Sequence, residues 1–293
     1  MKIFDCFQYF DENMMLDLRL NILNKFVDHF VIVENLYMHN GKKKEKNFNI
    51  NNFEKFKDKI EYILLDELPN DLHEINGDSG KKEHSKIIDN ALKIEKKQRN
   101  MIAHGLEKAN NEDLIFFSDV DEIPNLENFE YKNKITVFKQ KMMYYKFNLI
   151  YPNFTWMGSK VCKKKDFRSA EWLRNIKSKK YPWWRIDTLF SEKKFSDIGF
   201  IENGGWHFTN VKTVKDIDFK MRNFAHHLEY EESGIDQSSL KSNIDKKTVF
   251  YNHFADKSSK DKLDYEVKLK KTDMEELPAY IVKNIKKYNE WLE

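Results

Sequence analysis

Apolar residues in this chain of 293 fall into short runs and longer periodic stretches, and each pattern predicts its own kind of element. Short apolar runs between polar residues predict buried strands at residues 3–9, 30–33, 62–65 and 114–117. After the first run, apolar residues recur at helical spacing at Met15, Leu18, Ile22 and Phe26. Either Asp11 or Asn13 could cap this helix. The order strand, helix, strand predicts a parallel sheet.

A long helix is predicted over residues 83–109, immediately before the fourth strand. Gln98 falls on its apolar stripe and Arg99 on the border of that stripe. Polar groups in these places either hydrogen-bond to the sheet or reach into a site at the strand ends. The pattern leaves both alternatives open.

After Pro124 the pattern changes to one typical of a mixed or antiparallel region. Strands are predicted at 135–138 and 142–150, and helices at 213–228 and 278–292. The aromatic-rich stretch 144–156 indicates core, although Tyr and Trp beside a polar cleft also make platforms for stacking sugars. The fold class predicted from the whole pattern is α/β, with a mostly parallel central sheet flanked by helices and a mixed or antiparallel C-terminal part.

Composition narrows the class of protein. Apolar residues make up 40% and aromatic residues 14% of the chain, as in a globular protein, and the net charge of +3 leaves no footprint for nucleic acid. Two cysteines are too few for a zinc cage or a disulfide framework. The chain opens without a signal-peptide pattern, and no apolar run approaches the ~20 residues of a membrane span. We therefore expect a cytoplasmic protein without a transmembrane segment, which leaves room for peripheral membrane contact.

The fourth predicted strand ends in an acidic turn. Asp119, Asp121 and Glu122 follow four consecutive apolar residues, and Pro124 ends the regular structure. The carboxyl ends of parallel strands are where open α/β sheets bind ligands. Two carboxylates two positions apart there can reach one hard cation, which keeps further positions for phosphate oxygens. The run thus predicts a metal–diphosphate site, with a solvated acidic turn as the simpler alternative.

A second candidate segment lies at Gly204, Gly205, Trp206 and His207. The glycines allow a tight turn or a close approach to a ligand. His207 is a candidate metal ligand, phosphate contact or base, although a lone histidine is often structural.

Taken together, these residues resemble those of glycosyltransferase family 17. The resemblance extends nearly from end to end of the chain, and its most specific part is the run from Ser118 to Pro124. The other matching residues and segments are Asp5–Phe7, Asp17, Arg19–Leu20, Val31–Asn35, Gly41, Arg99–Asn100, Gly205–His207, Lys220, Phe224–His226, Leu277–Pro278, Tyr280 and Lys283–Asn284.

The resemblance implies a GT-A-type nucleotide-sugar transferase. It would use Mn²⁺ or Mg²⁺ and a UDP-sugar, invert the anomeric carbon, and move a sugar, N-acetylglucosamine above all, to a hydroxyl of a glycan acceptor. We expect one catalytic domain over residues 1–293. Residues 1–125 would form its nucleotide-binding half, and residues 126–293 the acceptor side with the C-terminal helices.

Roles can then be assigned to individual residues. The metal ligands are expected to be Asp119, Asp121 and His207. The donor-binding residues are expected to be Glu34, Arg99, Asp119, Trp206 and Lys220. Glu122 either supports the acidic turn or contacts the sugar. The candidates for the base that deprotonates the acceptor hydroxyl are Glu202, Asp187 and Glu229, and the last is displaced by one position from the family pattern.

Two other classes of function share parts of this pattern. A phosphatase of the haloacid dehalogenase type also has an Asp-x-Asp after a buried strand, but normally near its N-terminus. A non-catalytic carbohydrate-binding protein could use the aromatic residues, but it would not need three carboxylates in one turn.

Overall fold

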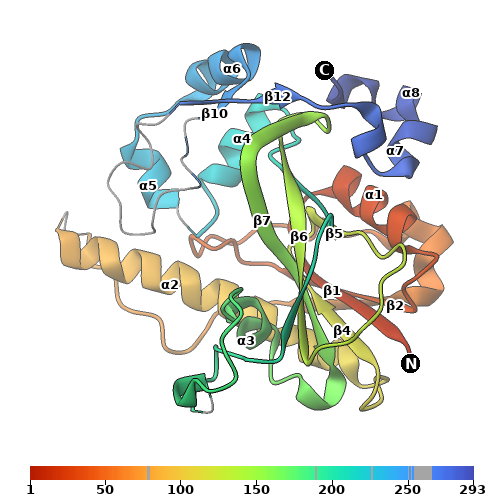
Figure 1. Cartoon of the computed structure of the whole chain (residues 1–293). Coiled ribbons are helices and arrows are strands. Elements are labelled where there is room, and N and C mark those ends of the chain that lie inside the picture. The colour runs from red at the N-terminus through yellow and green to blue at the C-terminus, as the bar shows by residue number, and fades with distance from the viewer. Residues whose placement is uncertain (78–79, 189, 226, 250, 252, 254–265) are drawn as a thin grey trace.

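The protein is an α/β structure built on one curled, mixed sheet, as the computed structural model shows (Figure 1). The structure describes residues 1–77, 80–188, 190–225, 227–249, 251, 253 and 266–293. The strands are β1 (Ile3–Tyr9), β2 (His29–Asn35), β3 (Ile60–Leu65), β4 (Leu114–Phe117), β5 (Glu122–Pro124), β6 (Ile135–Tyr144), β7 (Leu149–Lys163), β8 (Ile198–Ile201), β9 (Gly205–Thr209), β10 (Thr248–Val249), β11 (Val267–Lys268) and β12 (Lys270–Lys271). The helices are α1 (Asn13–Leu23), α2 (Lys81–Asn100), α3 (Ala170–Asn175), α4 (Val214–Met221), α5 (His227–Glu232), α6 (Gln237–Lys246), α7 (Ala279–Lys283) and α8 (Ile285–Tyr288).

The N-terminal half of the sheet is parallel, in the order β3-β2-β1-β4, as the strand–helix–strand pattern predicted. Successive side chains of a strand point to opposite faces, so an unbroken apolar run such as 30–33 needs cover on both faces. Helix α1 lies in the core cluster on one face, and α3 with the turn 101–106 lies in the cluster on the other. Because β1 and β4 are neighbours, the segments that follow their carboxyl ends meet at one edge of the sheet.

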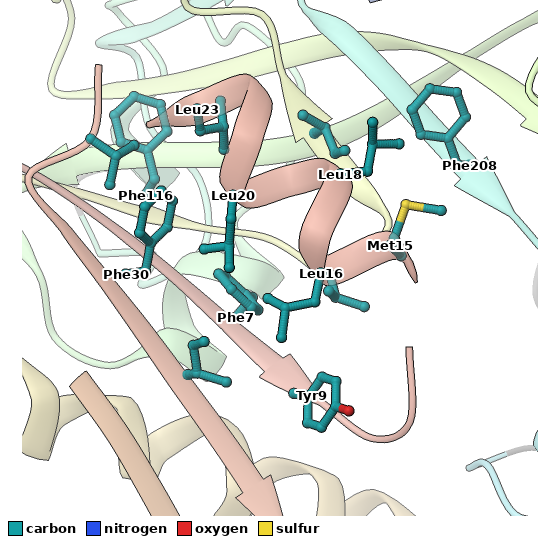
Figure 2. Close-up of a cluster of buried hydrophobic side chains, with 14 of the residues drawn as sticks. Phe7, Tyr9, Met15, Leu16, Leu18, Leu20, Leu23, Phe30, Phe116 and Phe208 are labelled. Carbon is teal, nitrogen blue, oxygen red and sulfur yellow. The ribbon is translucent and has the colours of Figure 1, made fainter. Parts of the chain in front are cut away.

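Helix α1 packs its leucines onto the sheet (Figure 2). Leu16, Leu20 and Leu23 are completely buried in one cluster with Phe7 and Phe30. Each such side chain contributes roughly 1.5–3 kcal/mol on burial, which fixes the helix relative to β1. The predicted cap is wrong, because the residue before the helix is Glu12 and its side chain makes no capping hydrogen bond.

The C-terminal half of the sheet is mixed. Strand β6 pairs antiparallel with β7 and parallel with β8 and β9, while β5 pairs antiparallel with β9. The strand predicted at 142–150 is wrong, since the chain reverses there between β6 and β7. Tyr145 has φ 65°, a left-handed conformation that ends a strand. The pairing of β5 with β9 places Glu122 opposite His207.

Three predicted helices are shorter or divided. The helix predicted at 83–109 is α2 followed by a 3₁₀ turn over Met101–Leu106. In this turn Gly105 lies against Val31, and a Cβ atom added to Gly105 would be 2.3 Å from Val31 Cγ1. The helix predicted at 213–228 is α4 and the start of α5, and His226 lies outside the described residues. The last helix is interrupted at Asn284, whose φ of −118° and ψ of 34° are not helical.

Two further expectations can be compared with the structure. Gln98 donates a hydrogen bond to the carbonyl oxygen of Val33 at 3.1 Å, so this polar residue of α2 bonds to the sheet. No helix among the residues that the structure describes is long and apolar enough to cross a membrane.

Candidate functional site

The acidic turn after β4 is held from behind by Arg19 of α1, whose side chain is completely buried. Its guanidinium donates to both carboxylate oxygens of Asp5 on β1, at 2.7 and 2.6 Å. It also donates to the carbonyl oxygens of Asp119 and Glu122, at 3.0 and 2.7 Å, and to Ser118 Oγ at 2.7 Å. The main chain of the turn is therefore shaped by one buried arginine.

Arg174 of α3 holds two carboxylates of the same turn. Its Nη2 donates to Asp119 Oδ2 at 2.7 Å, and its Nη1 to Glu122 Oε1 at 2.9 Å. Trp156 Nε1 on β7 donates to the same Glu122 oxygen at 2.7 Å. Glu122 is completely buried, and these contacts tie the turn to α3 and β7.

The pKa values of Asp119 and Glu122 depend on burial and on the charges around them. Burial alone would raise the pKa of Asp119, but Arg174 and Arg99 outweigh it and hold that pKa below its usual value. Burial raises the pKa of Glu122, and the negative charges of Asp119 and Asp121 add to the rise, against the effect of Arg174. Asp119 therefore carries a charge that Arg174 already balances.

Asp121 is placed differently from Asp119. Its Oδ1 lies 3.6 Å from His207 Nε2, and its Oδ2 lies 3.6 Å from Lys220 Nζ on α4. Only 8% of the residue is exposed, and its carbonyl oxygen accepts a hydrogen bond from the Phe208 N–H at 2.9 Å. The ring of His207 packs on Trp156, with 4.6 Å between the ring centroids. Within the described part of the chain, the Asp121 carboxylate thus faces two cationic or basic groups without the short hydrogen bonds that occupy Asp119.

A cavity of about 230 Å³ opens beside Asp121. The segment between β1 and α1 lines one part of it, through Asp11 and Glu12. Another part is lined by Lys212, which precedes α4, and by Lys220 of α4 itself. Burial alone would lower the pKa of Lys220, but Asp121, Glu12 and Asp11 together raise it. The cavity therefore combines several carboxylates with two lysines, and the carboxylates favour the charged form of Lys220.

Some of these residues could bind a metal ion. In the described part of the chain, no group of three or more His, Cys, Asp or Glu side chains is arranged to hold a metal. Asp121 and His207 supply two donors, and Asp119 is engaged by Arg174. Magnesium-type sites often use one or two protein ligands and take the remaining ligands from substrate phosphates and water. The residues therefore fit a cation that binds together with a phosphate.

Three expected donor-binding residues have other partners. Glu34 is completely buried and accepts hydrogen bonds from Lys44, from Tyr62 Oη and from the N–H groups of Asn47 and Phe48. Arg99 donates to Gln8, Glu95 and Glu171. Trp206 donates to the carbonyl oxygen of Glu276 at 2.7 Å, and it precedes His207 on β9, so the two side chains point to opposite faces. These residues stabilise the structure around the site.

The structure does not place the three candidate bases on the cavity. Glu202 forms an ion pair with Lys139, and 71% of its side chain is exposed. Asp187 pairs with Arg185 and Lys194. Glu229 lies on α5, where its charge contributes to a raised pKa of Tyr251.

Sequence reasoning missed the roles of Arg19 and Arg174. Arg19 carried a recognisable signal, because it lies among the leucines of the apolar face of α1, where a charge needs a partner. Asp11 and Glu12 follow β1 as Asp119 follows β4, so the strand-end argument applied to them as well. Arg174 is 52 residues from Glu122 and carried no such signal.

We expect the stability of the protein to depend on pH through Lys160 on β7. It donates to the carbonyl oxygens of Arg174 and Ile176, both at 2.6 Å. Burial, and then the charge of Arg174, lower its pKa to about 7. Between that pH and the usual lysine pKa of about 10.4 the unfolded chain binds the extra proton, so stability should rise with pH across this window and be lost as pH falls towards 7.

We expect Lys160→Met to be less stable than wild type, with a gap that widens by up to about 1.4 kcal/mol for each pH unit above 7. Urea denaturation at pH 7, 8 and 9 measures this gap. A constant gap would mean that Lys160 keeps its proton in the folded protein.

The sequence was also compared with known proteins. The family model described as glycosyltransferase family 17 matches residues 1–292. A search of curated proteins gives no match. The family match covers the sheet, the acidic turn, His207 and Lys220, and it sets aside the phosphatase and the non-catalytic carbohydrate-binding protein. The chain is a glycosyltransferase and belongs to family 17.

Proposed function

We propose that this glycosyltransferase is metal-dependent and inverting, and that it moves N-acetylglucosamine from a UDP-sugar to a glycan hydroxyl. The observation that carries the proposal is the Asp121 carboxylate, which follows the buried strand β4, faces His207 and Lys220 at 3.6 Å each, and lines a cavity. We assign the chain a GT-A-type fold in a single domain, with residues 1–125 on the nucleotide side and 126–293 on the acceptor side.

Each group has a role that its surroundings support. A divalent cation held by Asp121 and His207 would neutralise the leaving diphosphate. Lys220 remains protonated among carboxylates and adds a positive charge next to the same group. Trp156 supports the ring of His207, and Arg19 and Arg174 keep the acidic turn rigid. Preorganised charges of this kind stabilise the negative charge that develops on the leaving group.

The metal is the part of the proposal that needs a separate test, because Lys220 could balance the diphosphate by itself. The protein should be incubated with a panel of UDP-sugars and Mn²⁺ while UDP release is followed. We expect release from UDP-N-acetylglucosamine, lowered at least tenfold by EDTA and restored by excess Mn²⁺. On this basis, loss of the metal removes charge stabilisation worth at least about 1.4 kcal/mol.

Other results would change specific parts of the proposal. Unchanged release in EDTA would assign the diphosphate to Lys220 and exclude the metal. Release from a different UDP-sugar would correct the donor sugar. No release from any of them by a well-folded sample would contradict the UDP donor. The anomeric configuration of the released sugar, read by NMR before mutarotation, tests inversion.

A further inference from the structure

The cavity beside Asp121 holds a second pair of carboxylates, Asp11 and Glu12, in the segment between β1 and α1. Glu12 is fixed by its own main chain, because its Oε2 accepts hydrogen bonds from the N–H groups of Phe10 and Asp11 at 3.1 Å each. Its Oε1 lies 3.5 Å from Lys212 Nζ. The pair therefore occupies a defined position on the cavity wall.

Asp11 is only partly engaged. Its Oδ1 accepts a hydrogen bond from Lys212, and among the residues that the structure describes its Oδ2 has no hydrogen-bond partner. Its ion-pair partner Lys212 is shared, because the same Nζ also lies beside Glu12. One oxygen of Asp11 is thus free to accept a proton from a molecule in the cavity.

The surroundings separate the two carboxylates chemically. Burial raises the pKa of Asp11, the charge of Glu12 raises it further, and Lys212 and Lys220 oppose the rise. Burial would also raise the pKa of Glu12, but Lys212, Lys220 and two backbone N–H groups lower it to about 2. Neighbouring carboxyl groups whose pKa values are driven apart in this way are typical of sites in which one group takes up a proton while the other stays ionised.

We propose that Asp11 is the base of the transfer reaction and that Glu12 is its permanently charged partner. This rests on the proposed direct displacement. The oxygen of the acceptor hydroxyl forms the bond to the anomeric carbon, and the bond from that carbon to the diphosphate oxygen breaks, leaving its electron pair on the diphosphate. The hydroxyl proton passes to Asp11 Oδ2. Glu202, Asp187 and Glu229 do not line this cavity.

The test uses nucleophiles that differ in their need for a base. Water carries a proton that must be removed, whereas azide carries none, so azide bypasses a missing base. UDP release from UDP-N-acetylglucosamine with Mn²⁺ should be measured with and without sodium azide, using water in place of the acceptor hydroxyl. We expect Asp11→Asn to lower release into water by about 100-fold, with azide restoring it and a glycosyl azide as product.

A matched control is Asp17→Asn. Asp17 is another aspartate that pairs with a lysine, Lys287, and its side chain is 27% exposed against 26% for Asp11, but it does not line the cavity. We expect this variant to keep wild-type rates. Titration calorimetry with UDP should give the same affinity for Asp11→Asn as for wild type.

Several results would overturn the assignment of Asp11. A wild-type rate in Asp11→Asn would exclude it as the base. A lowered rate that azide does not restore, with UDP affinity intact, would show a structural role, and a loss of UDP affinity would show a nucleotide contact. If the wild-type protein itself releases no UDP, the proposed function fails, and that is seen before any variant is made.

Discussion

Replacement of Arg19 by methionine is expected to lower the free energy of unfolding by about 3–5 kcal/mol. Methionine keeps the unbranched shape of the side chain but removes every donor of the guanidinium. The Asp5 carboxylate would then be buried without its partner, and Ser118 Oγ and the carbonyl oxygens of Asp119 and Glu122 would each lose a hydrogen bond. Since an unpaired buried charge costs more than any one of these bonds, most of the loss should come from Asp5.

Urea denaturation of three further variants separates these contributions. Arg168→Met removes an exposed arginine that pairs with Glu192 at 3.3 Å, and it should cost less than about 1 kcal/mol. Arg19→Lys keeps the charge but not the fork of donors, so its stability should lie between those of wild type and Arg19→Met. Adding Asp5→Leu to Arg19→Met should recover part of the stability. Equal midpoints for Arg19→Met and Arg168→Met would contradict the central role of Arg19.

The parallel half of the fold could be predicted because its signals are local. Strand β1 has its predicted bounds, Ile3–Tyr9, and β4 follows the predicted apolar run. The missed features depend on distant contacts or on single backbone conformations. Helix α2 gives way to a 3₁₀ turn where Gly105 meets Val31, a residue 74 positions earlier, and the reversal after β6 passes through the left-handed Tyr145. Periodicity carries neither kind of information.

In the candidate site, too, local signals were predictable from the sequence and distant contacts were not. Strand-end reasoning selected Asp121, and the turn reasoning selected His207, and the structure brings both together with Lys220. The same reasoning selected Glu34, whose four hydrogen bonds come from a loop and a strand that no pattern placed beside it. Which of several strand-end carboxylates stays unoccupied is decided by side chains from other elements, as Arg174 decides it for Asp119.

Replacement of Asp121 by asparagine should abolish most of the transfer activity while leaving the fold intact. The change removes a charge but keeps the side-chain volume. Among the residues that the structure describes it breaks no short hydrogen bond, because the ion-pair partners His207 Nε2 and Lys220 Nζ both lie at 3.6 Å. If Asp121 stabilises the departing diphosphate through a cation, we expect UDP release to fall by about 100- to 1000-fold. The Mn²⁺ concentration for half-maximal activity should rise as well.

Asp119→Asn is the matched comparison, since the two aspartates are two positions apart in the same turn. Asp119 balances Arg174 through a contact of 2.7 Å, so its loss should reduce stability more than the loss of Asp121 does. Rates of UDP release across a Mn²⁺ series measure the activity of each variant, and urea midpoints measure its stability. If Asp121 acts in the reaction, as proposed, and Asp119 holds the turn, Asp121→Asn should lose more activity and Asp119→Asn more stability. If Asp119→Asn instead removes the Mn²⁺ response and Asp121→Asn does not, the cation belongs on Asp119, and Arg174 must release that carboxylate when the donor binds.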